Sequence, residues 1–171
     1  MGIGFYEEAV KIQEFYQQNK KFENSMQSNA TLVTDAVLDF CERCEFDIGS
    51  SLDGPEEVHN LTRVYPDSTG SFHDVWAGLQ KIKQRNSELR KNSVKGKTKH
   101  LGGGAIVILN KLNIGRLEEI YEFFKSHNMS PKINPLIKSG RATENYNDLG
   151  IGSAEYGQAL VKLFDRWFYE S

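Results

Sequence analysis

The sequence is poor in cysteine and carries almost no net charge. It contains two cysteines in 171 residues. Two thiols cannot close a structural zinc or iron–sulfur site, because such a site takes four ligands. The formal net charge is −2 and the pI is about 6.1, so the chain has no strong field to attract nucleic acid or an acidic membrane surface. The composition therefore argues against a nucleic-acid partner.

Long apolar runs are missing as well. No stretch approaches the roughly 20 apolar residues that a membrane-spanning helix needs. The N-terminus lacks the charged and then apolar pattern of a signal peptide. The sequence therefore predicts a protein that does not enter a membrane and is cytoplasmic.

What the sequence does contain is typical of one soluble globular domain over residues 1–171, with 39% hydrophobic and 26% charged residues. Helical and strand-like apolar patterns alternate along it. Helical spacing occurs in Phe5 to Gln17, Asp35 to Arg43, the segment after Ser71, Leu117 to Phe124 and the segment after Ala154; strand-like runs are Lys21 to Gln27, Phe46 to Leu52, Ala105 to Leu109 and Pro131 to Ile137. This order predicts an α/β fold with a parallel sheet and right-handed crossovers.

A basic segment interrupts this alternation. Residues 83–99 are rich in lysine, arginine, asparagine and serine and almost free of apolar side chains, which predicts a flexible, solvated loop or a frayed helix end. Docking of nucleic acid or of a precursor peptide is the alternative. The segment has no interleaved aromatic residues that could stack on bases, which favours the loop.

The two cysteines form a Cys-x-x-Cys pattern at Cys41 and Cys44. They fall in the helix predicted from Asp35 to Arg43, where residues three apart share a face, and a small thiol is often buried there. A redox pair or half of a metal site is the alternative. We expect buried thiols, since disulfides are rare in reducing compartments.

The most informative stretch runs from Ser50 to Arg63. It follows the strand-like run at Phe46 and breaks into an Asp-Gly-Pro turn, so its polar groups are delivered to the carboxyl end of a parallel sheet, where ligands bind in α/β folds. The planar fork of Arg63 near the Ser51 hydroxyl suits a small zwitterionic or anionic ligand. A solvated surface arginine beside an ordinary turn is the alternative.

Two motifs in this region resemble those of a known family. Ser51-Leu52-Asp53-Gly54-Pro55, followed by His59 and Arg63, is similar to the fourth-strand motif of radical S-adenosylmethionine enzymes that modify proteins and peptides. Upstream, the segment Asn24 to Leu32 resembles the third-strand Gln-Thr-Asn-Gly-Thr-Leu pattern of the same enzymes. The resemblance is to the anaerobic sulfatase-maturase-like branch, many of whose members carry a C-terminal SPASM extension. It covers nearly the whole chain, as far as Leu163 to Trp167.

The resemblance implies a partial TIM-type (βα) barrel with outer helices, of which this chain would hold about four of six parallel strands. It also implies that Ser51 and Arg63 contact S-adenosylmethionine, the arginine at the methionyl carboxylate and the serine near the sugar or methionyl part. Gln27 and Asn29 would line the same cavity from the neighbouring strand. Leu136 falls where the sixth strand offers backbone groups to the adenine.

The chain departs from the family pattern in several places. Ser28 and Ala30 replace the usual threonine and glycine of the third-strand motif. The Cys-x-x-x-Cys-x-x-Cys segment that holds the [4Fe–4S] cluster of the full-length family, and the Gly-Gly-Glu stretch that follows it, are not in this sequence, and Cys41 and Cys44 lie in the wrong element to replace those thiolates. This chain alone is therefore expected to be inactive, because the hard chemistry belongs to the cofactors.

Two interpretations remain open. The chain is part of an enzyme that cleaves S-adenosylmethionine to a 5′-deoxyadenosyl radical and oxidises or crosslinks a side chain of a peptide or protein substrate. Alternatively, it is a non-catalytic binding or scaffold module with a residual S-adenosylmethionine or peptide cleft. Either way four strands leave an open sheet edge, so we expect a missing N-terminal segment, a partner chain or a homo-oligomer to cover it.

Overall fold

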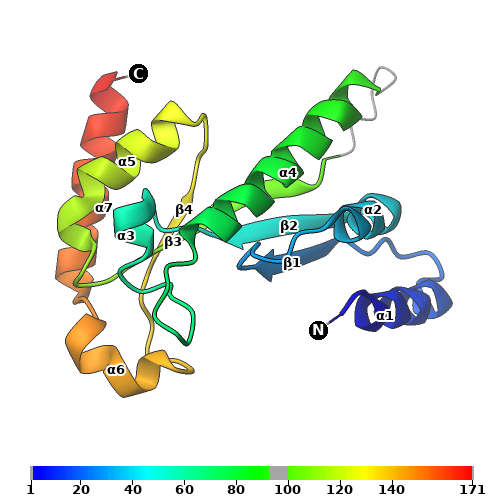
Figure 1. Cartoon of the computed structure of the whole chain (residues 1–171), viewed down its shortest axis with the longest axis horizontal. Helices are drawn as coiled ribbons and strands as arrows, with labels where there is room; N and C mark the ends of the chain where they lie inside the picture. Colours follow the sequence, from blue (N-terminus) through cyan, green and yellow to red (C-terminus); the bar gives the residue numbers. More distant parts are fainter. Residues whose placement is uncertain (1, 93–99, 171) are drawn as a thin grey trace. The chain divides into compact units, whose positions relative to one another are not determined.

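The computed structural model describes residues 2–92 and 100–170. The elements are, in chain order, α1 (Ile3–Tyr16), β1 (Asn24–Ser28), α2 (Asp35–Cys44), β2 (Phe46–Ser51), α3 (Glu56–His59), α4 (Phe72–Lys91), β3 (Gly102–Leu109), the 3-10 turn η1 (Ile114–Arg116), α5 (Leu117–Ser126), β4 (Lys132–Pro135), α6 (Ala142–Leu149) and α7 (Ser153–Glu170). Figure 1 shows this alternation of helices and strands.

The strands form one parallel sheet in the order β1-β2-β3-β4. β1 pairs with β2 so that Met26 lies opposite Ile48, and β3 pairs with β4 so that Val107 lies opposite Ile133. Backbone hydrogen bonds also join β2 to the β3 strand, as in the contacts from Ile48 N–H to the Leu101 carbonyl at 2.8 Å and from Leu52 N–H to the Ile106 carbonyl at 3.1 Å. The predicted α/β fold, a partial (βα) barrel with four parallel strands and helices, is confirmed.

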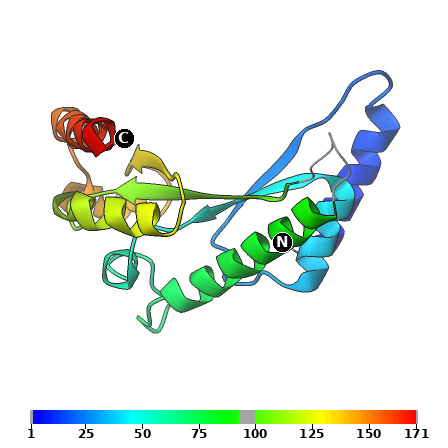
Figure 2. The ribbon, with the colours of Figure 1, turned by 90° about the horizontal axis from the view of Figure 1, so that it is seen from above.

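The chain forms two compact units rather than the one body expected from its length. The first comprises the described residues of Met1–Ser50 and Asp74–Gly103, and the second comprises Ser51–His73 and Gly104–Ser171, again as far as described. In the first unit α4 lies along the strands, as Figure 2 shows. Its core is apolar and closed around buried side chains of α2, β2 and α4: Leu38, Phe40, Phe46, Ile48, Val75, Leu79 and Ile82.

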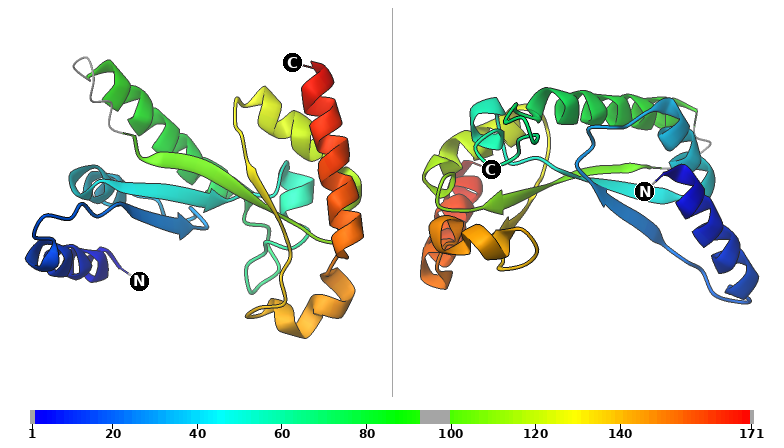
Figure 3. Two further views of the ribbon diagram at one scale, coloured as in Figure 1. Left: turned by 180° about the vertical axis from the view of Figure 1, so that it is seen from behind. Right: turned by 60° about the horizontal axis from the view of Figure 1, so that its bottom comes forward.

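The second unit holds the C-terminal helices. α5 and α7 pack against each other beside β3, and α6 follows β4, as Figures 2 and 3 show from different sides. Buried residues of β3 and α5 form its core, among them Val107, Leu109, Ile120 and Phe124. The helix α6 was not foreseen, since no helical spacing was predicted between Ile137 and Ala154.

One local prediction differs in part from the structure. Helix α4 extends to Lys91, so the first half of the basic loop predicted at 83–99 is helical, while residues 93–99 lie outside the described part. The helix continues because the Arg85 side chain pairs with Asp39 and Glu42 of α2, and because Asn86 is bonded to the backbone that enters β3. The predicted helix α1 exists, but none of its residues is buried.

No helix among the described residues is both long and apolar enough to span a bilayer.

Candidate functional site

The loop that follows β2 is the centre of the candidate site. Leu52 continues the pairing of β2 by donating its N–H to the Ile106 carbonyl at 3.1 Å. The chain then turns at Gly54, whose φ of +139° is available to glycine but rarely to other residues. A Cβ at Gly54 would also lie 3.1 Å from the Ile120 side chain of α5. The turn therefore packs closely against α5. It places Asp53 directly after Leu52, which continues the pairing of β2 with β3.

Asp53 is buried and holds the side chain of Arg63. Its carboxylate accepts from Arg63 Nε at 2.6 Å through Oδ2 and from Arg63 Nη2 at 3.2 Å through Oδ1. Oδ1 also accepts from the backbone N–H of Ile108 at 2.8 Å. The Asp53 side chain is 1% exposed and the Arg63 side chain 25%. The guanidinium is therefore fixed in orientation while part of it still reaches the surface.

The buried side chain of His59 connects the same loop to the start of α4 through hydrogen bonds at both of its ring nitrogens. Its Nδ1 accepts from the Asp53 N–H at 3.3 Å, and its Nε2 lies 3.1 Å from the Ser71 hydroxyl. The Ser71 hydroxyl in turn donates to the Arg63 carbonyl at 2.9 Å. Because Nδ1 is the acceptor, the proton of the neutral ring lies on Nε2 and is donated to Ser71. Burial lowers the pKa of His59 to about 4, which keeps the ring neutral at physiological pH.

Beside Arg63 lies a cavity of about 620 Å³ within the second unit. Three parts of the unit form it: the loop after β2, the ends of β3 and β4, and helix α6. Its lining includes Asp53, Thr62, Arg63, Tyr65, Ser68, Ile108, Asn110, Leu136, Arg141, Asn145 and Leu149. The size falls within the range of roughly 300–1,000 Å³ that is usual for sites of small molecules.

Of the predicted site residues, Arg63 and Leu136 both line this cavity. The backbone N–H of Leu136 donates to the Leu109 carbonyl at 2.8 Å, so this amide is used to hold the strand end beside β3. The adenine contact predicted for Leu136 would thus depend on its side chain and its carbonyl.

The other predicted residues lie elsewhere. Ser51 is the half-buried last residue of β2 and is not part of the cavity lining. Gln27 and Asn29 belong to the first unit and are exposed. The Gln27 side chain covers Gly49, where a Cβ would lie 2.2 Å from Gln27 Oε1, and the Asn29 carboxamide accepts from the hydroxyl of Thr31 at 3.1 Å.

Most residues of the cavity lining were not among the predicted site residues, and Arg141 and Asn145 are two of them. Arg141 is the N-cap residue of α6 and Asn145 lies within α6, a helix that the sequence did not predict. Helix α6 has no buried residue, so no apolar stripe marks it in the sequence.

The cysteines do not fit an iron–sulfur cluster. Both are free, and Cys41 is buried in α2. Burial, with a smaller contribution from Cys44, raises the pKa of the Cys41 thiol to about 11, whereas a cluster ligand must be a thiolate. Among residues 2–92 and 100–170 there is no group of three His, Cys, Asp or Glu side chains that could hold a metal ion. The predicted buried-thiol reading holds for Cys41.

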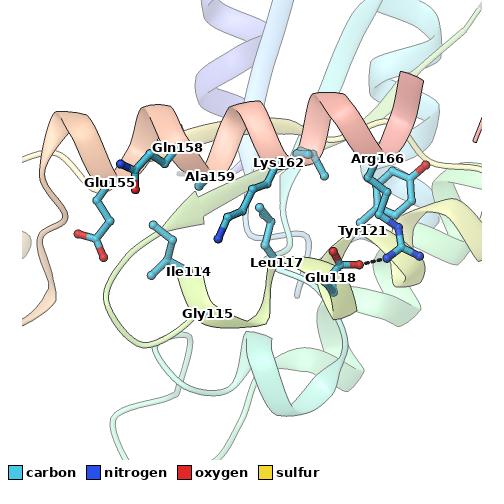
Figure 4. A pocket seen from close by; sticks show the side chains of 11 residues that line it. Ile114, Gly115, Leu117, Glu118, Tyr121, Glu155, Gln158, Ala159, Lys162 and Arg166 are labelled. Carbon is cyan, nitrogen blue, oxygen red and sulfur yellow. Dashed lines mark hydrogen bonds and ion pairs between the residues drawn. The ribbon is translucent and has the colours of Figure 1, made fainter. Parts of the chain in front are cut away.

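A further cavity of about 340 Å³ lies between α7 and the start of α5 (Figure 4). Arg166 of α7 reaches across to Glu118 and Glu122 of α5 and also pairs with Glu170. The charge of the guanidinium is thus neutralised by carboxylates of the protein itself, so this contact connects two helices rather than forming a ligand site.

No family model matches the chain. It is 24% identical over 183 residues to the serine-type anaerobic sulfatase-maturating enzyme of Bacteroides thetaiotaomicron, covering 98% of this chain and 41% of that protein. It is 25% identical over 174 residues to the cysteine-type enzyme of Clostridium novyi, covering 98% of this chain and 42% of that protein.

The fold is shared with solved structures of the same kind of enzyme. A structure of native anSMEcpe with bound AdoMet and Kp18Cys peptide aligns with a TM-score of 0.77 at 22% identity, over 99% of this chain and 43% of that one. A structure of native anSMEcpe with bound AdoMet gives the same TM-score and coverage. The chain is thus a homologue of the anaerobic sulfatase-maturating enzymes of the radical S-adenosylmethionine type, and it spans less than half of their length.

Proposed function

We propose that this chain supplies the S-adenosylmethionine-binding part of an enzyme that oxidises or crosslinks a side chain of a peptide or protein. The observation that carries the proposal is the cavity of the second unit, where an arginine held by a buried aspartate lies beside a strand end. The relatives support it, because one similar solved structure contains both AdoMet and a peptide.

The geometry of Arg63 suits a carboxylate ligand. A guanidinium has five N–H donors in a fixed fork, and Asp53 uses one on Nε and one on Nη2. The remaining edge, formed by Nη1 and the outer side of Nη2, is the second bidentate face of the same plane. Because Asp53 fixes the plane, this edge is pre-oriented toward a methionyl carboxylate, and little side-chain entropy is lost on binding.

The remaining contacts of the nucleotide follow from the same proposal. The Leu136 side chain would give the adenine an apolar wall, with its carbonyl as a hydrogen-bond acceptor. The contacts predicted for Ser51, Gln27 and Asn29 stay predictions. When bound, S-adenosylmethionine would supply the group that abstracts hydrogen from the substrate, and this chain's own residues bind and orient it.

The cluster would have to be held by residues from outside this sequence, because the chain has two cysteines and neither suits the role. This observation favours a second candidate function for the chain by itself, that of a binding module without redox chemistry. A segment, partner chain or second copy that covers the outer strands β1 and β4 also remains part of the proposal.

Calorimetry with S-adenosylmethionine and S-adenosylhomocysteine tests the binding proposal. Arg63→Ala removes the charge, and Arg63→Lys keeps the charge but loses the fork. We expect both variants to weaken binding, by about 1.5–3 kcal/mol for the loss of a charge-assisted contact. Arg116→Lys is the matched control, because Arg116 pairs with Glu119 on the surface outside this cavity. Unchanged binding by folded Arg63→Lys and Arg63→Ala proteins would refute the assignment.

Anaerobic reconstitution with iron and sulfide tests whether this chain alone can hold a cluster. We expect the chain to bind the nucleotide and to stay colourless under these conditions. The absorbance of a [4Fe–4S] centre on this chain alone would contradict the reading of Cys41 and Cys44 given above.

A further inference from the structure

We infer that Arg141 forms a second anion-binding position in the cavity beside Arg63, and that it takes the carboxylate of an acidic residue in the peptide substrate. The inference deepens the proposed function and rests on it. It names the substrate class as peptides with an Asp or Glu near the modified side chain.

The charges of the cavity lining are the first step. The lining contains one carboxylate, that of Asp53, and two guanidinium groups, those of Arg63 and Arg141. Asp53 is the ion-pair partner of Arg63 at 2.6 Å. Within residues 2–92 and 100–170, the Arg141 side chain forms no salt bridge or hydrogen bond. The cavity therefore carries one positive charge that the described protein does not neutralise, and it lies at Arg141.

The position of Arg141 on its helix is the second step. Arg141 is the N-cap residue directly before α6, and Asn145 lies four residues further on within the helix. Residues four apart share a face of a helix, and both of these line the cavity together with Leu149. The face of α6 turned to the cavity thus offers a guanidinium fork followed by a carboxamide. A fork with an adjacent amide donor is suited to a planar carboxylate.

The ligand of Arg141 is inferred from the charges of S-adenosylmethionine, which has no second anionic group to offer. S-adenosylmethionine has a single anionic group, the methionyl carboxylate, and Arg63 would bind it. Its sulfonium and amine are cationic and would be repelled by a further arginine. An unneutralised Arg141 in the same cavity is therefore explained by a second ligand that brings its own negative charge. The peptide is the second ligand of the proposed reaction, so the charge comes from an acidic side chain of that peptide.

Peptide binding tests this inference. The probes are short fluorescein-labelled peptides with a central Cys or Ser and a single Glu at successive positions, each paired with the same peptide carrying Gln. Fluorescence anisotropy is measured with the protein saturated with S-adenosylhomocysteine. We expect at least one Glu peptide to bind about tenfold more tightly than its Gln partner, and Arg141→Gln to abolish that preference.

Lys138→Gln is the matched control. It removes one positive charge three residues away, and Lys138 does not line the cavity. It should keep the Glu preference. Nucleotide binding by Arg141→Gln, measured by calorimetry, should be no weaker than that of the unaltered protein, so failure of the proposed function shows separately as loss of nucleotide binding in all proteins. Equal binding of the Glu and Gln peptides, no binding of either, or a preference retained by Arg141→Gln would each overturn the inference.

Discussion

Arg63 Nε donates to Asp53 Oδ2 at 2.6 Å, and this pair links two residues of the second unit that are ten positions apart in the sequence. Asp53 is also the acceptor for the Ile108 N–H of β3 at 2.8 Å. The carboxylate therefore receives three hydrogen bonds, two from the guanidinium and one from the sheet. The Asp53 side chain is 1% exposed and the Arg63 side chain 25%. Loss of the partner should therefore cost more stability for the buried carboxylate than for the guanidinium, which can be hydrated.

This inequality predicts different costs for the two single substitutions. Arg63→Ala leaves a buried carboxylate with one remaining donor, so we expect the free energy of unfolding to fall by about 3–5 kcal/mol at neutral pH. Asp53→Asn leaves an arginine that can turn toward solvent, and we expect a smaller loss of about 1–3 kcal/mol. Urea unfolding of both variants measures the two values.

The double variant is the control for this pair. In Arg63→Ala with Asp53→Asn no buried charge remains, so the double variant should be more stable than Arg63→Ala alone. A double variant that loses the sum of the two single losses would mean that the residues are not coupled.

Part of this site could be predicted from the sequence. An Asp-Gly-Pro turn after an apolar run placed the polar groups at the end of a parallel strand, and the four strands and their order follow from short apolar runs between helical patterns. The ion pair could not be predicted, because nothing in the spacing of Asp53 and Arg63 says that the arginine turns toward the aspartate. The division into two units, with Gln27 and Asn29 in the first, depends on three-dimensional packing, which a single sequence does not state.

The basic segment shows why charge is a weak guide to the end of a helix. Lysine, arginine and asparagine after Ile82 suggested a solvated loop, yet α4 continues to Lys91. The decisive contacts join residues that are far apart in the sequence. The Asn86 side chain accepts from the Leu101 N–H at 2.8 Å and donates to the Gly102 carbonyl at 3.1 Å. Each of these residue types is compatible with either a helix or a loop, so the choice is made by the tertiary contact.

Asn86→Ala is therefore expected to destabilise the first unit. Leu101 is buried, and its N–H would lose its acceptor, which costs about 1–3 kcal/mol. Urea unfolding gives the magnitude, and hydrogen exchange should show faster exchange of the Leu101 amide. Gln84→Ala in the same helix is the control, because Gln84 is bonded only to exposed Glu88 among the contacts that the structure describes. A Gln84→Ala loss as large as that of Asn86→Ala would contradict the role given to Asn86.

Two helical glycines should respond in opposite ways to alanine. A Cβ at Gly78 of α4 would lie 2.0 Å from the Ala30 carbonyl oxygen, so Gly78→Ala must push the helix away from that loop. We expect a loss of about 1–3 kcal/mol from overpacking, although alanine is the better helix former.

Gly157 of α7 is the matched control for Gly78. Nothing lies within 4 Å of a Cβ at that position. Gly157→Ala should therefore raise stability by about 0.5–1 kcal/mol through helix propensity alone. Thermal unfolding of both variants measures the difference in sign, and a stabilised Gly78→Ala protein would show that α4 does not approach Ala30 closely.

The buried ring of His59 predicts a dependence of stability on pH. Its pKa is about 4 in the folded protein, mainly because burial disfavours the charged ring, against an ordinary value of 6.5. As the pH falls from about 6.5 to about 4, the unfolded chain binds a proton that the folded chain does not. The contribution of His59 is therefore fully present above pH 6.5 and is lost through this window, by an amount on the order of 3 kcal/mol.

Unfolding by urea at a series of pH values measures this slope. Nearby Asp53 raises the pKa of the ring and Arg63 lowers it, so the slope should change in Arg63→Ala. His59→Gln keeps a donor at the position of Nε2, which is 3.1 Å from the Ser71 hydroxyl, but has no group that titrates in the window. It should be less stable than the unaltered protein at pH 7 because the Asp53 N–H loses its acceptor, and its stability should fall less steeply toward pH 4. An equal slope in both proteins would show that His59 is already exposed to protons in the folded state.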